Sequence, residues 1–379
     1  MPEPQEHRWP CAQCGAQLRF APGQTSLTCG HCGHVQAIVS ETPWARAEAL
    51  RELDLAKGLQ DDLASGDMVE VRTSSCPNCG AQVEMSGAAH ATECPFCATP
   101  VVLDTGTHRL IKPQAILPFV LTEAEARKAM IAWMGNLWFA PGSLLEYARK
   151  GRAMTGIYTP FWTFDADTAS RYSGQRGEYY YETRTVSVRV NGRTEQRQEQ
   201  VRHTRWYPAN GRVARDFNDV LVMASQSLPP RLGDELTPWD FGKLVPYKPE
   251  YLAGFQAEGY TVPLADGHAV ARDRMADVIR SDVRRDIGGD EQRISSIDTS
   301  WTDETFKHVL LPVWMAAYKY NGKSYRFVVN GQTGEVQGER PWSIWKIAFA
   351  VILVLALVTG AVYLADPQAV EEALPSWMD

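Results

Sequence analysis

Residues 11–33, CAQCGAQLRFAPGQTSLTCGHCG, contain two Cys-x-x-Cys pairs, and residues 76–97, CPNCGAQVEMSGAAHATECPFC, contain two more. Both stretches have the spacing C-x2-C-x14-C-x2-C, and the second begins 65 residues after the first. The tetrapeptide Cys-Gly-Ala-Gln occurs at 14–17 and again at 79–82. This self-similarity indicates an internal duplication, and the paired spacing is typical of metal ligation.

The chemistry of a four-sulfur metal site explains this spacing. Thiolates two residues apart can hold one ion from a tight turn, and two such pairs complete a tetrahedral site. Gly15 and Gly80 stand where the turn favours a residue tolerant of positive φ. Each module is too short to bury a stable core, so metal binding must supply on the order of 10 kcal/mol of its folding free energy.

We therefore predict two structural Zn²⁺ ions, because four protein ligands leave no open coordination position. Iron in a rubredoxin-like site, and redox or disulfide use of the cysteines, are the alternatives. His31, His34 and His90 are expected to be surface residues. The predicted ligands are Cys11, Cys14, Cys29 and Cys32 in the first ribbon, and Cys76, Cys79, Cys94 and Cys97 in the second.

Composition and charge narrow the class of partner. The chain of 379 residues has 44% hydrophobic and 22% charged residues and a formal net charge of −7, which excludes a wholly disordered or fibrous protein. Residues 1–110 hold seven Lys or Arg against thirteen Asp or Glu, a net charge of −6. Binding to phosphates needs clustered cations, so the ribbons favour a protein partner over nucleic acid.

The C-terminal part contains a candidate membrane span. Residues 347–364 carry no charge, and eleven of these eighteen are Ile, Leu, Val or Phe. As a helix they extend about 27 Å, close to the roughly 30 Å hydrocarbon core. A buried core helix is the alternative. Arg326, Arg340 and Lys346 precede the span, whereas the tail has only acidic charges. The positive-inside rule then predicts a single-pass protein with a cytoplasmic N-terminal bulk, where cysteines stay reduced. The polar N-terminus predicts no signal peptide.

Residues 111–340 predict an α+β region with a mainly antiparallel sheet. Thr122 and Glu125 form a capping-box pattern that opens a helix to about Met134, and a second helix is expected over 266–286. Alternating valines before Asn191-Gly192 predict a hairpin. Its return strand, 193–206, is polar on both faces, so we expect this hairpin to project from the body. Another hairpin is expected over 309–329.

The predicted fold is thus α+β, with two zinc ribbons joined by a short helix, a middle region and one transmembrane helix. Leucines within 43–64 favour a spacer helix that packs on a ribbon, with a coiled-coil partner as the alternative. The predicted divisions are ribbon 1 (8–40), a helical linker (41–72), ribbon 2 (73–105), the middle region (111–340), the transmembrane helix (344–365) and a short extracytoplasmic tail (366–379).

No catalytic motif stands out. Gly322-Lys323-Ser324 is similar to the end of a P-loop, but Ala317 occupies the place of the first glycine. There is no G-x-S-x-G and no H-E-x-x-H. His203, His268 and His308 are isolated in the sequence. We therefore expect no enzymatic site, with an unrecognised site in the middle region as the alternative.

Further motifs carry a family resemblance over most of the chain. They are IYTPFW at 157–162, WYP at 206–208, PWD at 238–240, YLAGF at 251–255, LPVW at 311–314 and VNGQTG at 329–334. With the cysteine sets, which resemble zinc ribbons of the transcription-factor-IIB type, they resemble a bacterial family of membrane-anchored double-zinc-ribbon proteins. Members are often labelled primosomal protein N′ (replication factor Y), a helicase-like name.

The resemblance implies a YdjG-type adaptor at the bacterial inner (plasma) membrane. Such an adaptor is linked with phage-shock-type coat proteins and SPFH-domain proteins in membrane-stress responses. The helicase label fits poorly, since a helicase needs a Walker A loop and an acidic Mg²⁺ motif. A nucleic-acid-binding ribbon protein linked to replication or transcription is the alternative function.

Overall fold

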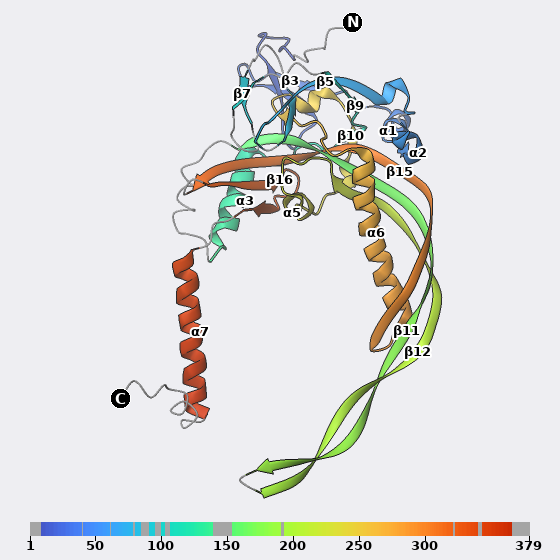
Figure 1. Cartoon of the computed structure of the whole chain (residues 1–379). Helices are drawn as coiled ribbons and strands as arrows, with labels where there is room; N and C mark the ends of the chain where they lie inside the picture. Colours follow the sequence, from blue (N-terminus) through green and yellow to red (C-terminus); the bar gives the residue numbers. More distant parts are fainter. Residues whose placement is uncertain are drawn as a thin grey trace.

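The computed structural model describes residues 9–39, 41–60, 62–78, 80–84, 91–94, 100–102, 107–138, 154–190, 193–320, 323–339 and 343–365. Within them the chain is α+β and mostly sheet (Figure 1). The α-helices are α1 (Pro43–Ala49), α2 (Leu55–Leu59), α3 (Glu123–Gly135), α5 (Pro230–Asp234), α6 (Leu264–Ile287) and α7 (Ile344–Ala365).

One large sheet dominates the molecule. Its three long strands, β11 (Thr155–Val190), β12 (Arg193–Met223) and β15 (Glu291–Tyr320), are antiparallel, and the strand order is β12-β11-β15-β10-β13. Shorter strands complete it: β4 (Leu53–Asp54), β10 (Ala115–Ile116), β13 (Val245–Pro246), β14 (Gln256–Ala257), β16 (Lys323–Asn330) and β17 (Val336–Gly338). Only β10–β15 and β11–β14 pair in parallel among these described strands, which confirms a mainly antiparallel region.

The cysteine modules form small separate sheets. The first contains β1 (Leu18–Phe20), β2 (Ser26–Cys29) and β3 (Val35–Ala37) in that order. The second module lies among β5 (Met68–Ser75), β6 (Gln82–Glu84), β7 (Ala91–Glu93), β8 (Pro100–Val102) and β9 (Thr107–Ile111). Figure 1 shows these elements gathered on one side of the large sheet, while α7 leaves the body on the other side.

Local signals position the two main helices of the body as predicted. Thr122 and Glu125 make both hydrogen bonds of a capping box at the start of α3. Gly288, with a φ of 64°, ends α6. Every fourth residue from Ala271 to Ile287 is buried, and this stripe packs α6 along the concave side of the long strands (Figure 1).

The hairpin formed by β11 and β12 projects from the body, as its polar return strand predicts. Pairing of β11 with β15 ends at Gly177, opposite Glu291. Beyond that point β11 and β12 continue alone to the pair Val190–Arg193. We call residues 178–190 and 193–205 the arm; Figure 1 shows it reaching far from the other elements.

The predicted single spacer helix over 43–64 is wrong. The chain instead forms α1, then β4, then α2. Leu53 pairs with Phe306 of β15, and both Leu53 and Leu55 are buried in the core of the large sheet. This tertiary burial outweighs the local helical pattern, and the spacer therefore packs on the middle region.

Candidate metal centre

The first cysteine set folds into two equivalent turns. In the first, the Gly15 N–H donates to the Cys11 carbonyl over 2.9 Å, and the Cys11 N–H donates to the Ala16 carbonyl over 2.7 Å. In the second, the Gly33 N–H donates to Cys29 over 3.0 Å, and the Cys29 N–H to His34 over 2.8 Å. Gly15 and Gly33 both have a φ of 74°, a backbone conformation that favours glycine.

These turns bring all four sulfur atoms together. The Sγ atoms of Cys11, Cys14, Cys29 and Cys32 lie within 4.8 Å of one another. Cys11 and Cys32 are 3.6 Å apart and Cys14 and Cys29 are 3.5 Å apart between Sγ atoms, and none of the four forms a disulfide. A tetrahedral ion with metal–sulfur bonds of about 2.3 Å spaces its sulfurs by about 3.8 Å. The donor set therefore fits a tetrathiolate metal site, with His31 and His34 outside it.

The thiols of this cluster differ in pKa because their hydrogen bonds differ. Backbone N–H groups of Cys32 and His31 lower the pKa of Cys29 to about 6. The backbone N–H of Ala16 lowers the pKa of Cys14, but hydrogen bonds with neighbouring thiols and burial outweigh it and raise that pKa to about 12. Metal binding releases such protons, because the thiolate is the ligand form.

The first ribbon is fixed to the body. The Phe20 N–H donates to the Ala253 carbonyl over 2.8 Å, and the Phe20 ring lies 5.2 Å from the ring of Tyr251. The Gly23 N–H donates to the Phe119 carbonyl over 2.9 Å. Cys11 and Cys29 belong to the same buried apolar cluster as the middle-region core. The ribbon thus has a defined orientation on the large sheet.

The second set repeats the turn that its sequence predicts. The Gly80 N–H donates to Cys76 over 2.9 Å, the Cys76 N–H donates to Ala81 over 2.8 Å, and Gly80 has a φ of 73°. Cys76 and Cys94 are buried in one apolar cluster. Cys79, Cys97 and His90 lie outside the described residues, so a second four-sulfur group stays a prediction.

Comparison with known proteins gives one distant likeness. The chain is similar to a protein named "Uncharacterized protein YdjG" from Bacillus subtilis (strain 168), with 28% identity over 350 residues. The match covers 89% of this chain and 91% of that protein. No protein-family profile and no solved structure matches the chain.

Two buried polar clusters at the large sheet were not predicted from the sequence. Lys307 Nζ lies 2.9 Å from Glu52 Oε1 and 3.0 Å from Asp219 Oδ1. The buried Glu258 accepts hydrogen bonds from the hydroxyls of Ser225 and Ser227, over 2.7 and 3.1 Å. No local signal could reveal them, because partners such as Glu52 and Lys307 are 255 positions apart.

The three histidines of the middle region have ordinary structural partners. His268 Nε2 lies 3.0 Å from Glu304, and His203 lies 3.7 Å from Glu182. The buried His308 contacts the Ile111 carbonyl over 2.8 Å through Nδ1, and burial lowers its pKa to about 4. Trp162, Trp239 and Trp314 are buried core residues, whereas Trp206 and Trp301 are partly buried.

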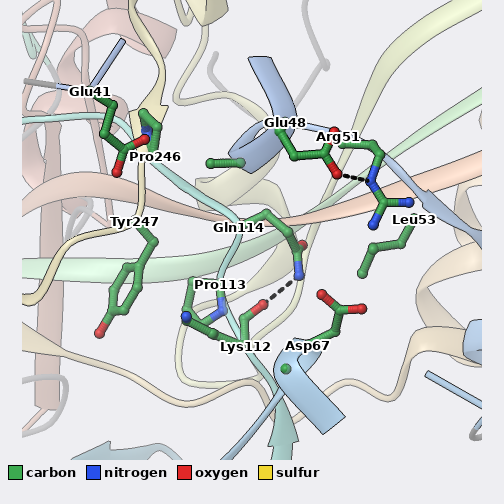
Figure 2. A pocket seen from close by; sticks show the side chains of 12 residues that line it. Glu41, Glu48, Arg51, Leu53, Asp67, Lys112, Pro113, Gln114, Pro246 and Tyr247 are labelled. Atoms are coloured by element: carbon green, nitrogen blue, oxygen red, sulfur yellow. Dashed lines mark hydrogen bonds and ion pairs between the residues drawn. The ribbon is translucent and has the colours of Figure 1, made fainter. Parts of the chain in front are cut away.

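A polar pocket of about 340 Å³ opens between the spacer and the middle region. Figure 2 shows the Glu48–Arg51 ion pair on one wall and, on another, the Gln114 amide donating to the Lys112 carbonyl. Its twelve lining residues include no Ser, Thr, Cys or His.

Proposed function

We propose that this chain is a non-enzymatic, membrane-anchored zinc-ribbon adaptor that recruits or scaffolds cytoplasmic proteins at a bacterial inner (plasma) membrane. One observation carries the proposal: a cluster of four cysteines is built into one side of the body, while an apolar helix with no buried residue over 344–361 leaves the other side. A metal ion bound by four protein thiolates has no open coordination position for a substrate. Its role is then to stabilise the surrounding fold and the surface that this fold presents.

The anchor rests on α7. Residues 344–361 have a mean hydropathy of 2.3, and none of this stretch is buried within the structure. Leaving so much apolar surface in water is unfavourable, whereas a hydrocarbon environment satisfies it. We propose α7 as a single membrane span with the ribbons on the cytoplasmic side, as its flanking charges predict.

The charged arm must stay out of the hydrocarbon. Figure 1 shows α7 and the arm leaving the body on the same side, and charged side chains are costly inside a bilayer. We therefore propose that, on insertion, α7 takes another angle to the body, so that the arm lies in the aqueous phase.

The candidate docking strip follows the first metal site. β3 is exposed along its whole length, and Val35, Val39 and Trp44 are 55%, 81% and 78% exposed. Three large apolar side chains within ten residues favour a protein partner. By resemblance, that partner is a phage-shock-type coat protein or an SPFH-domain protein acting in membrane stress. A second Zn²⁺ is proposed at Cys76, Cys79, Cys94 and Cys97.

The test is crosslinking in native membranes followed by purification of the chain. Deleting residues 1–110 would also remove β4 and its core residue Leu53, so surface substitutions are preferable. We expect Val35→Asp combined with Val39→Asp to lose the cytoplasmic partner while keeping the metal content. The control, exposed Val278→Asp on α6, should keep it. Equal recovery of partners with all three chains would refute recruitment by the ribbon.

A further inference from the structure

β12 has an unpaired edge. It is the outermost strand of the large sheet, and no strand in the described ranges pairs with its outer side. The unpaired N–H and C=O groups of such an edge are a template for another strand. In the arm this edge is far from the helices that cover the body (Figure 1).

The arm cannot be stabilised by a hydrophobic core. Its described side chains are mostly exposed on both faces, and residues 178–205 carry six Arg and four Glu. A two-stranded ribbon is at best marginally stable in water. At its base, Arg202 and Arg205 stack over the rings of Tyr179 and Tyr180, at 4.3 and 4.9 Å. Nearer the tip, an additional strand would supply backbone hydrogen bonds that the arm lacks.

Residues 196–200, Gln-Arg-Gln-Glu-Gln, are self-complementary about Gln198. All five side chains are exposed. If two such strands pair antiparallel about a two-fold axis through Gln198, Arg197 of each copy lies opposite Glu199 of the other. Gln196 then lies opposite Gln200. Opposite charges directly across an antiparallel pair attract, and like charges repel.

The strand geometry permits this register. Residues that lie opposite each other in an antiparallel pair point their backbone groups the same way, inward or outward. A two-fold axis through Gln198 pairs even-numbered residues with even-numbered ones and odd-numbered residues with odd-numbered ones. The backbone N–H and C=O groups that point away from one arm therefore meet those that point away from the other. Neither Arg197 nor Glu199 forms an ion pair with any residue that the structure describes. Within the arm, Arg197 lies opposite Val186, and Glu199 lies opposite Arg184. Arg197 therefore has no opposite charge across its own arm, and the exposed Glu199, although it faces Arg184, can also contact Arg197 of a second copy.

We propose that two copies of this chain associate by antiparallel pairing of their β12 edges, centred on Gln198. The two arms then form one four-stranded ribbon with a two-fold axis. Such an interface is isologous, since the same surface is used by both copies. The occupant of the free edge is thus a second copy of this chain, selected by the charge pattern of residues 196–200. This inference does not depend on the proposed adaptor function.

The test is the mass of the full chain in detergent micelles, measured by light scattering over a range of concentrations. The wild-type chain should dimerise. Arg197→Glu places Glu opposite Glu, and Glu199→Arg places Arg opposite Arg, so each single variant should dimerise at least about tenfold more weakly. Arg212→Glu is the control, because Arg212 is an exposed residue of the same strand outside the register.

Charge reversal separates pairing from misfolding. The double variant Arg197→Glu with Glu199→Arg restores both opposite-charge pairs and should dimerise like the wild type. A mixture of the two single variants should form heterodimers, since both cross pairs are then attractive. A monomeric wild type, or single variants that dimerise as strongly as the wild type, would overturn the proposal.

Discussion

At Cys29 the local backbone prepares a metal ligand before any metal arrives. Its own N–H is used in the turn with His34, while the N–H groups of Cys32 and His31 favour its thiolate form. All these groups lie within six consecutive residues, so the spacing of the sequence is enough to predict them. The same turn recurs at Cys11 and Cys76, which is why the ligand prediction transfers between modules.

Cys29→Ser should remove the metal from ribbon 1. We expect the zinc content of the purified chain, measured by mass spectrometry, to fall by about half, because one of the two proposed four-sulfur sites is lost. The thermal unfolding temperature should also fall, since Cys29 shares a core with the body. His31→Ala serves as the control and should keep both values. Unchanged zinc in Cys29→Ser would show that these thiols are not ligands.

Glu258 should make stability depend on pH. Burial raises its pKa to about 8, from an ordinary value of 4.5, against the lowering effect of Ser225 and Ser227. The folded state therefore binds more protons between these values, and stability decreases as the pH rises from about 4.5 to about 8. Glu258→Gln should flatten this dependence, which urea unfolding at several pH values measures. Exposed Glu235→Gln should not, and an unaltered slope in Glu258→Gln would contradict the assignment.

At the scale of elements, the features that depend on neighbouring residues were predicted from the sequence, and those that depend on distant residues were not. The capping box that starts α3 and the glycine that ends α6 are determined by residues close together in the sequence. The path of 43–64 depends instead on Phe306 and Lys307, more than 240 positions away, and no periodicity in the spacer encodes them. The continuous helix was therefore mispredicted, although Leu53 and Leu55 of its leucine stripe are buried and Leu59 is exposed.

Lys307→Met should loosen the contact between the spacer and the long strands. It leaves Glu52 and Asp219 without the ammonium group that both contact. Removing one partner of a largely buried ion pair costs on the order of 2–3 kcal/mol here, since Glu52 is partly exposed. The control Lys243→Met breaks an exposed pair with Asp240, worth less than about 1 kcal/mol. Equal midpoints of urea unfolding for the two variants would contradict this role.

For the whole molecule, sequence predicted the parts better than their assembly. The polar hairpin, the α+β class and the apolar helix follow from patterns within about thirty residues. The order of the large sheet does not, because β10 joins β15 and β4 joins β15 across long intervals of chain. The contacts of ribbon 1 with Tyr251 and Phe119 could likewise not be predicted from the sequence.

Removing α7 should release the protein from membranes. A chain ending at Glu339 lacks the one described helix long and apolar enough to span a bilayer. We expect it in the supernatant after carbonate washing, whereas the full chain stays in the pellet. Retention of the shortened chain would locate the membrane contact elsewhere.

The proposed function requires a metal ion bound by four thiolates in a chain that is held in a membrane. The most direct measurement is zinc X-ray absorption on carbonate-washed membranes enriched in the full chain. We predict a first shell of four sulfur atoms at about 2.3 Å from the zinc. A shell containing nitrogen or oxygen, or the absence of chain-bound zinc from the washed membranes, would contradict the account.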